Sequence, residues 1–238
     1  MGYRGLGLLY SMQNNFPIVV LLSGRGSNFR ALTQRLSDAH ICAVISDRTE
    51  APGLEFAREQ GIKTFAFARQ DFPTKIAQKE AIYSAVDSFK SKLIVLAGFM
   101  QIIEGPFVER NLGRILNIHP SLLPRHPGLH THERALEAKD EEHGCTVHFV
   151  DAGVDTGPVV AQAATKIAPG ESAEALAGRV LALEHDIYPW AVSHIARGEI
   201  SILGREVSYS VRCRAEADGH GFRIGREACP QAAGSNGA

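Results

Sequence analysis

Short apolar runs alternate with amphipathic segments along the first half of the chain. Residues 17–22 form a β-branched and apolar run, typical of a strand buried on both faces. A Gly-rich break follows at residues 23–28, and Phe29, Leu32 and Leu36 then recur at the spacing of one helix face. The alternation continues with expected helices at residues 53–60 and 75–89 and expected strands at residues 41–45, 63–67, 93–97 and 115–118. This pattern predicts an α/β, Rossmann-like fold: a mainly parallel twisted sheet with helices on both faces and binding sites at the carboxyl ends of the strands.

The second half of the chain adds strands of a different kind. Residues 145–150 and 158–167 alternate in polarity, as expected for strands with two unlike faces. A short helix is expected near residues 134–138, and a longer amphipathic helix begins after Ser172, which can cap it.

Domain boundaries follow from where this pattern starts and stops. Beyond Gly204 large apolar residues become sparse and the sequence ends in small and polar residues. We therefore expect a flexible N-terminal extension over residues 1–16, one domain over residues 17–204, and a disordered or loosely attached tail over residues 205–238.

Composition narrows the class of protein. The 25 Lys and Arg residues nearly balance the 26 Asp and Glu residues, so the formal charge of −1 gives no attraction to nucleic acid or to anionic membranes. Because no apolar run approaches the roughly 20 residues that span a bilayer, an integral membrane protein is excluded. The four cysteines form no C-x-x-C pair, which favours neither a zinc site nor a disulfide framework, and we expect a cytoplasmic location.

The Gly-rich loop is a candidate anion site. Glycines after a buried strand let the backbone approach a ligand, and free amides at the start of the next helix attract a phosphate. The loop lacks the Lys of a P-loop and the third Gly of a dinucleotide fingerprint, so ATP and NAD are disfavoured. A tight turn in which Ser27 caps the helix explains the same residues equally well.

Histidines are concentrated in one part of the chain. Six of the ten lie between residues 119 and 148, which raises the possibility of a metal site. No H-E-x-x-H motif occurs, and His130 and His132 lie in a Pro- and Gly-rich loop. We therefore expect no metal.

Asn117, His119 and Asp155 form a better candidate site. Asn117 and His119 are two residues apart at the end of an expected strand, so both can project into the crevice. An amide and an imidazole can stabilise an oxyanion, and a nearby carboxylate can hold the imidazole in its tautomer and charge state. The spacing alone is also compatible with residues that only shape turns.

Five sequence segments occur in the order typical of one enzyme family. They are Ser-Gly-Arg-Gly-Ser-Asn at 23–28, Leu-Ala-Gly-Phe-Met at 96–100, Asn-Ile-His-Pro-Ser-Leu-Leu-Pro at 117–124, Pro-Gly-Leu-His-Thr-His at 127–132 and Asp-Thr-Gly-Pro at 155–158. From about Pro17 to Gly204, the chain resembles the phosphoribosylglycinamide formyltransferases. The resemblance implies the Rossmann-like formyltransferase fold and transfer of a formyl group from 10-formyltetrahydrofolate to the amine of 5-phosphoribosylglycinamide, a step of purine biosynthesis.

The resemblance also implies binding residues for both substrates. Gly26, Ser27 and Asn28 would bind the substrate phosphate, and Glu184 would contact the glycinamide. The residues implied for the folate are Lys75, Met100, Gln101, Ile102, Ile103 and Asn117. The family often has Arg where Lys75 and Gln101 stand here, and we expect these departures to affect folate affinity because neither side chain offers the planar fork of Arg.

The expected mechanism follows from this chemistry. The glycinamide amine attacks the formyl carbon, while the Asn117 amide and a His119 imidazolium paired with Asp155 stabilise the oxyanion. Asp155 then relays a proton from the amine to folate N10 through water. His148, two residues beyond Thr146 on one strand face, either orders that water or Asp155, or is a core histidine.

Three other functions use some of the same residues. A formyltetrahydrofolate deformylase shares the Asn-His-Asp set but usually carries an extra N-terminal domain, and a methionyl-tRNA formyltransferase carries a C-terminal RNA-binding domain. A non-catalytic phosphate sensor needs only the Gly-rich loop. We expect small-molecule substrates as partners, with no nucleic acid and no membrane, and the sequence gives no indication of oligomeric state.

Overall fold

The structure is a computed structural model that describes residues 16–103, 105–225 and 228. The expected N-terminal extension lies outside the described residues except for Phe16. Within the described part of the chain, no helix is both long enough and apolar enough to cross a membrane.

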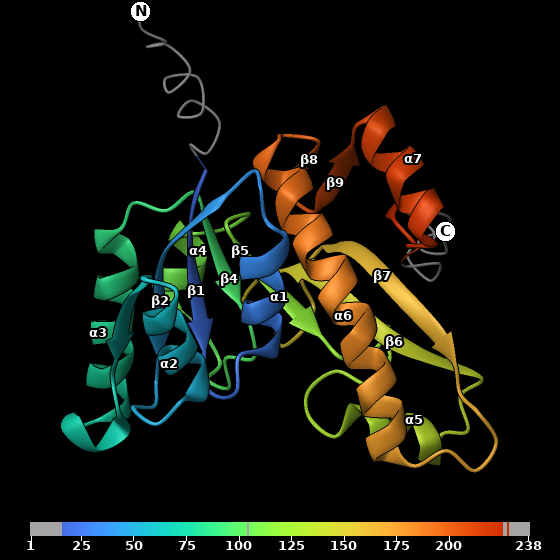
Figure 1. Cartoon of the computed structure of the whole chain (residues 1–238), viewed down its shortest axis with the longest axis horizontal. Helices are drawn as coiled ribbons and strands as arrows, with labels where there is room; N and C mark the ends of the chain where they lie inside the picture. The colour runs from blue at the N-terminus through green and yellow to red at the C-terminus, as the bar shows by residue number, and fades with distance from the viewer. Residues whose placement is uncertain (1–15, 104, 226–227, 229–238) are drawn as a thin grey trace, which may run out of the picture.

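Seven strands form one sheet in the order β3-β2-β1-β4-β5-β6-β7 (Figure 1). The parallel strands are β1 (Pro17–Leu22), β2 (His40–Ser46), β3 (Lys63–Ala66), β4 (Leu93–Leu96) and β5 (Ile115–His119). β6 (Glu142–Phe149) pairs antiparallel with β5 and also with β7 (Val159–Lys166). The α/β, Rossmann-like architecture predicted from the sequence is therefore confirmed.

β1 is central and buried on both faces. Ile18, Val20 and Leu22 point into one hydrophobic cluster, and Val19 and Leu21 point into the other. All five are completely inaccessible to solvent. The continuous apolar run of β1 thus reflects helix layers on each side of the sheet.

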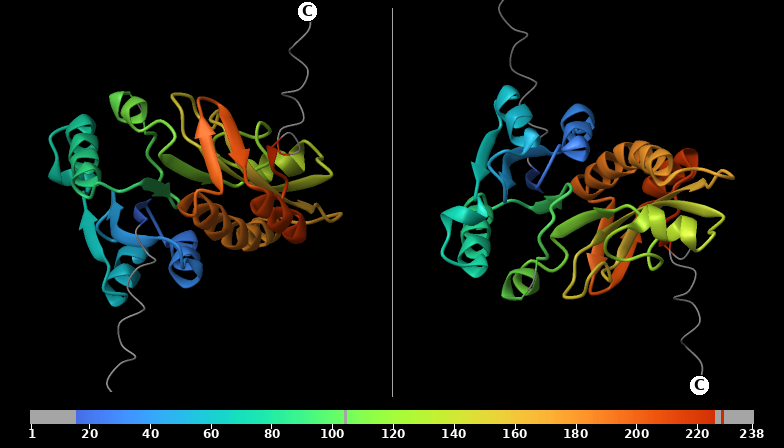
Figure 2. Two further views of the ribbon diagram at one scale, coloured as in Figure 1. Left: turned by 90° about the horizontal axis from the view of Figure 1, so that it is seen from above. Right: turned by 90° about the horizontal axis from the view of Figure 1, so that it is seen from below.

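The two helix layers are visible when the sheet is seen along its edge (Figure 2). The first cluster includes residues of α1 (Ser27–Arg35), α2 (Pro52–Glu59) and α6 (Ala173–Ala196), and the second includes residues of α3 (Lys75–Ser88) and α4 (Pro106–Arg110). α5 (Thr131–Glu137) packs against α6, and a 3₁₀ turn, η1 (Arg69–Asp71), precedes α3.

The sheet reverses its strand order at β1, because β2 lies on one side of it and β4 on the other. Loops leave the carboxyl ends of β1 and β4 together: Ser23 N donates to Gly98 O at 3.0 Å, and Met100 N donates to Ser23 Oγ at 2.9 Å. Such a reversal is where open α/β sheets bind ligands.

α6 is fixed to the sheet by a buried tyrosine. Tyr188 Oη donates to the carbonyl oxygen of Leu96, the last residue of β4, at 2.9 Å, and lies 3.0 Å from that of Leu116, the second residue of the neighbouring β5. Glu184 lies one turn earlier on the same helix face, so the tyrosine also sets where that carboxylate lies.

The segment after Gly204 is folded rather than loose. β8 (Ile200–Leu203) and β9 (Glu206–Tyr209) form a hairpin, and α7 (Val211–His220) follows, with Cys213 and Ala217 fully buried. Phe222 is 7% exposed and its ring lies edge-on to Trp190, with centroids 5.4 Å apart.

The expectation of a loosely attached tail was therefore wrong for residues 205–225. Polar contacts add to the packing, because Arg223 joins β7 through a backbone pair with Gln162 and makes two hydrogen bonds of 2.7 Å with Glu142. The count of large apolar residues missed the small buried side chains that let α7 approach the domain. Apart from Ala228, which is fully buried, the rest of the expected tail lies outside the described residues.

A core substitution tests this attachment. Phe222→Ala should lower the free energy of unfolding by about 3 kcal/mol, since it removes a buried aromatic side chain. Val211→Ala is the matched control: Val211 is 86% exposed, and its truncation should change the same free energy by no more than about 0.5 kcal/mol. Urea denaturation of both variants measures the difference, and equal stability would contradict the packing of this segment.

Candidate active site

Asn117, His119 and Asp155 lie together in the structure. Asn117 and His119 are two residues apart at the carboxyl end of β5, so their side chains leave the same face of the strand. His119 Nδ1 is 3.4 Å from Asp155 Oδ2. Asn117 Nδ2 donates to His148 Nε2 at 3.1 Å, and His148 Nε2 is 3.7 Å from Asp155 Oδ1. The fold thus brings the three predicted residues together, with His148 as the link between Asn117 and Asp155.

Both ring nitrogens of His119 face oxygen acceptors. His119 Nε2 is 3.0 Å from the carbonyl oxygen of His126, which can only accept, so this nitrogen carries a proton. Nδ1 faces the Asp155 carboxylate, which also accepts a 2.8 Å hydrogen bond from Gly128 N. An imidazolium satisfies both contacts of the ring, and it would place a positive charge beside the Asn117 amide.

His148 is both a core residue and a part of this site. It is 2% exposed, its Nδ1 donates to Phe149 O at 3.0 Å, and its Nε2 accepts from Asn117. Burial lowers the pKa of His148, which matches a neutral ring with one donor and one acceptor. The neutral ring orients the Asn117 amide, whose second N–H can donate to a substrate oxygen.

A tight turn brings Asp155 back toward β5. Asp155 has a left-handed backbone with φ 54°, and Asp151 stabilises the turn by accepting from Thr156 Oγ1 at 2.6 Å and from Gly153 N at 3.1 Å. Arg205, from the β8–β9 turn, donates to Asp151 at 2.7 Å and to Thr156 O at 2.6 Å. The segment after Gly204 therefore supports the active-site turn directly.

Gly157 is required by the close approach of two chain segments. A Cβ atom at this position would lie 1.7 Å from Phe149 O. No side chain fits at that distance, and the return of the chain from the turn into β7 depends on glycine.

Thr146 supports the loop that follows His119. It lies opposite His119 in the β5–β6 register. Its hydroxyl donates to Ser121 O at 2.6 Å and accepts from Leu123 N at 3.0 Å and from Gln162 Nε2 at 2.9 Å. Thr146 thus acts on the site through the loop.

The Gly-rich loop ends in an uncapped helix. Gly26 is the N-cap of α1, with φ 70°, and no side chain caps the first turn. The alternative in which Ser27 caps the helix is therefore wrong, since Ser27 is its first residue. The opening amides of α1 have no intrahelical acceptor, which suits them to bind an anion.

Asn28 and Glu184 form a buried pair between α1 and α6. Asn28 Nδ2 donates to Glu184 Oε2 at 2.7 Å, and the two residues are 8% and 7% exposed. The Asn28 Oδ1 atom is buried without a hydrogen-bond partner among the described residues. This pair places an acceptor and a carboxylate beside the amides that open α1.

The segment after β4 divides into exposed and buried residues. Met100 and Ile102 are 61% and 59% exposed, which leaves two large apolar side chains available to a ligand, whereas Ile103 is buried in the core. Gln101 Nε2 donates to Asp47 Oδ2 at 3.0 Å and to Gln78 Oε1 at 3.3 Å.

Lys75 lies exposed at the start of α3, one turn before Gln78 on the same helix face. Because Gln78 contacts Gln101, the first turn of α3 lies next to the segment after β4. The helix that begins with the predicted folate residue Lys75 therefore contacts the segment of the predicted folate residue Gln101, through Gln78.

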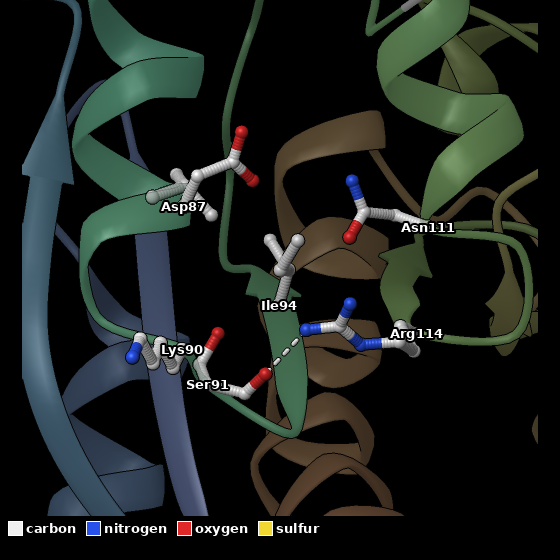
Figure 3. A pocket seen from close by; sticks show the side chains of 7 residues that line it. Asp87, Lys90, Ser91, Ile94, Asn111 and Arg114 are labelled. Atoms are coloured by element: carbon white, nitrogen blue, oxygen red, sulfur yellow. Dashed lines mark hydrogen bonds between the residues drawn. The ribbon is translucent and has the colours of Figure 1, made fainter.

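A cavity of about 310 Å³ lies at the other end of the strands (Figure 3). Its lining residues are Val86, Asp87, Lys90, Ser91, Ile94, Asn111 and Arg114. None of these is a predicted site residue, and Arg114 donates to Ser91 O across the cavity. Among the described residues no group of three or more His, Cys, Asp or Glu side chains is arranged to hold a metal ion.

Comparison with known proteins gives the family. Residues 16–192 match the family described as formyl transferase. The chain is 43% identical over 190 residues to the phosphoribosylglycinamide formyltransferase of Escherichia coli K12, a match that covers 78% of this chain and 89% of that protein. The chain belongs to the formyl transferase family.

Other relatives of this formyl transferase are larger proteins. It is 39% identical over 189 residues to the trifunctional purine biosynthetic protein adenosine-3 of Homo sapiens, a match that covers 78% of this chain and 19% of that protein. The chain thus spans most of the bacterial relative and about a fifth of the trifunctional one.

Solved structures agree with the fold of this formyl transferase. Glycinamide ribonucleotide transformylase 1 from Symbiobacterium toebii superposes with a TM-score of 0.79 at 40% identity, covering 85% of this chain and 97% of that one. The phosphoribosylglycinamide formyltransferase from Coxiella burnetii, in complex with CHES, gives a TM-score of 0.77 at 43% identity, covering 82% and 93%.

Sequence reasoning missed the backbone groups of the site in this formyl transferase. The His126 carbonyl and the Gly128 amide contact His119 and Asp155, but a backbone contact leaves no side-chain pattern to read. The one signal in the sequence was Gly128 itself, because glycine favours a left-handed backbone, and the structure gives it φ 78°. Arg205 was missed because it lies in the segment expected to be loose.

The hydroxyl of Thr146 can be tested by isosteric substitution. Thr146→Val leaves Ser121 O and Leu123 N without a buried partner and removes one of the two acceptors of Gln162 Nε2. It should lower the free energy of unfolding by about 2 kcal/mol or more. Thr146→Ser retains the hydroxyl and should lose less than about 1.5 kcal/mol. Urea unfolding of both variants measures the two losses, and a loss in Thr146→Val no larger than that in Thr146→Ser would contradict the dominant role of the hydroxyl.

The buried carboxyl of Glu184 should make stability depend on pH. Burial raises the pKa of Glu184 above its ordinary value of 4.5, and the Asn28 hydrogen bond opposes the rise. Because the folded-state pKa is the higher one, the stabilisation by the neutral carboxyl is present at acid pH and is lost as pH rises through the folded pKa.

Glu184→Gln removes this loss. The variant should therefore gain stability relative to the parent as pH rises from about 4 to about 7. Urea unfolding at a series of pH values measures the difference. Glu137→Gln, at an exposed position of α5, is the control and should show no such trend. A constant difference between Glu184→Gln and the parent across that pH range would contradict the raised pKa.

Proposed function

We propose that this formyl transferase moves the formyl group of 10-formyltetrahydrofolate to the amine of 5-phosphoribosylglycinamide. The products are formylglycinamide ribonucleotide and tetrahydrofolate, in purine biosynthesis. The observation that carries the proposal is the His119 ring held between Asp155 and the His126 carbonyl beside the Asn117 amide. Identity above 40% to bacterial phosphoribosylglycinamide formyltransferases supports the choice of substrates.

The acceptor substrate is held at the start of α1. The phosphate binds the amides of Gly26, Ser27 and Asn28, where the helix dipole favours negative charge. The free Asn28 Oδ1 and the Glu184 carboxylate then accept hydrogen bonds from the polar groups of the glycinamide ribonucleotide. This arrangement directs the amine toward the end of β5.

The folate substrate binds on the segment after β4. Met100 and Ile102 offer apolar surface to its rings, and the cation of Lys75 attracts its carboxylate tail. The Gln101 side chain is engaged by Asp47 and Gln78, so its contribution is to shape the segment. Neither Lys75 nor Gln101 provides a bidentate fork for a carboxylate.

The chemical step uses Asn117, His119 and Asp155. As the amine attacks the formyl carbon, the carbonyl oxygen becomes an oxyanion, which the Asn117 N–H and the charge of the His119 imidazolium stabilise. Asp155 accepts a proton from the attacking amine through water and returns it to folate N10, which leaves as the neutral amine of tetrahydrofolate. Holding both substrates in one crevice contributes several kcal/mol toward the barrier.

The substrate class, the cellular location and the metal requirement complete the proposal. We propose that the enzyme acts on small molecules in the cytoplasm, without a metal ion. The near-zero net charge supports the first part, since it provides no general attraction for nucleic acid or membranes.

A turnover assay tests the function and separates it from hydrolysis. Incubation with both substrates should release tetrahydrofolate and form the formylated ribonucleotide in equal amounts. Omission of phosphoribosylglycinamide should abolish the release. Release that continues without the amine identifies a deformylase, and no release under either condition contradicts the proposal.

Substitution of the three central residues should reduce turnover. His119→Ala and Asp155→Asn should each lower kcat at least about 100-fold, because each removes charge aimed at the transition state. His130→Asn is the control on the same loop, since the His130 side chain is 76% exposed and Asn tolerates its left-handed backbone. Melting temperatures show that the variants fold. Near-parental turnover in His119→Ala would overturn these roles.

A further inference from the structure

Three consecutive residues, His126-Pro127-Gly128, connect the two charged groups of the site. The His126 carbonyl oxygen is 3.0 Å from His119 Nε2, and the Gly128 amide donates to Asp155 Oδ2 at 2.8 Å. Since His119 Nδ1 faces that same Asp155 oxygen, the tripeptide closes a ring of hydrogen bonds around the pair. The direction of the His119 ring therefore depends on how firmly this tripeptide is held.

Two side chains hold the tripeptide from outside the site. His126 Nε2 is 2.7 Å from Asp140 Oδ2, and Arg134 Nη1 donates to Pro127 O at 2.5 Å. Both side chains of the His126–Asp140 pair are largely buried, at 12% and 16% exposed. A pair so shielded from water is stronger and better oriented than a surface pair.

Asp140 itself sits on a rigid support. Its backbone amide donates to Ala135 O at 3.1 Å in the turn after α5, two residues before β6 begins. The guanidinium of Arg125 lies 3.6 Å from the same carboxylate oxygen. Asp140 is therefore fixed by α5 and β6, whereas His126 belongs to a loop.

The backbone conformation of His126 couples the His126–Asp140 contact to the His119 ring. His126 has φ 53°, a left-handed conformation that side chains other than glycine adopt at a cost. That conformation turns the His126 carbonyl toward His119 while the imidazole extends toward Asp140. Release of the imidazole would free the backbone to relax, and the carbonyl would lose its direction.

We propose that Asp140, acting through His126, is a positioning residue for the His119–Asp155 pair. Asp140 sets the orientation of the His119 ring from outside the substrate crevice. The proposal rests on the proposed function only for its activity readout, because the state of the His119 ring can be observed without substrates.

Removal of the anchor should reduce turnover but not substrate binding. Asp140→Ala should lower kcat about 10- to 100-fold, the effect of a small displacement of a catalytic group. The KM for phosphoribosylglycinamide should stay within about twofold, because the loop that binds phosphate lies elsewhere in the fold. Asp140→Asn keeps an oxygen that accepts from His126 Nε2–H, and should restore kcat to within about threefold of the parent.

Matched variants separate positioning from general effects. Glu137→Ala removes an exposed carboxylate at the end of α5, three residues before Asp140, and should leave kcat unchanged. His126→Asn tolerates the left-handed backbone but is too short to reach Asp140, so it should match Asp140→Ala. In the double variant the two losses should not add, because both break one contact. Additive losses would contradict the proposal.

A spectroscopic readout tests the His119 ring directly. The ¹⁵N signals of the His119 nitrogens in the full chain, assigned from their absence in His119→Ala, should shift in Asp140→Ala and stay in place in Glu137→Ala. Unchanged His119 signals in Asp140→Ala overturn the proposal, whether or not kcat falls. If Asp140→Ala does not fold, the comparison of Asp140→Asn with His126→Asn decides. If the parent shows no formyl transfer, the proposed function fails, while the ¹⁵N signals still settle the positioning role.

Discussion

The burial of β1 on both faces is the constraint on which the rest of the structure depends. Its side chains alternate between two hydrophobic clusters, so helices must cover the sheet on each side. β2 pairs with one edge of β1 and β4 with the other, so the strand order reverses at β1. Ser23 links the loops that leave β1 and β4, at the position where open α/β sheets bind their ligands.

β5 pairs parallel with β4 and antiparallel with β6, and the antiparallel pairing places the partners of Asn117 and His119. In the antiparallel register, Asn117 lies opposite His148 and His119 lies opposite Thr146. Each predicted residue of β5 thus gains a neighbour on β6: His148 orients the amide, and Thr146 holds the loop after His119. The loop after β6 then returns Asp155 to the same place.

Sequence patterns predicted those parts of the fold that rest on local hydrophobic order. The parallel strands, the main helices and the cluster of Asn117, His119 and Asp155 all appear in the structure close to the expected positions. The segment after Gly204 was expected to be loose, but it is folded. Its buried residues Cys213 and Ala217 have small side chains, and a count of large apolar residues does not include them. The alternative of a Ser27 cap, which the sequence left open, does not hold because Gly26 occupies the N-cap position with a left-handed backbone.

The sequence by itself determined the layers of the fold and the residue types available for catalysis, because periodicity and chemical identity are local properties. Only the tertiary structure decided how those groups are oriented. The carbonyl oxygen of His126, seven residues along the chain, requires a proton on His119 Nε2. Arg205, which is 50 residues from Asp155 in the sequence, stabilises the turn of Asp155 through Asp151. Such contacts join backbone atoms and distant side chains. Their energy depends on distance and angle in space, and neither is written in the order of residues.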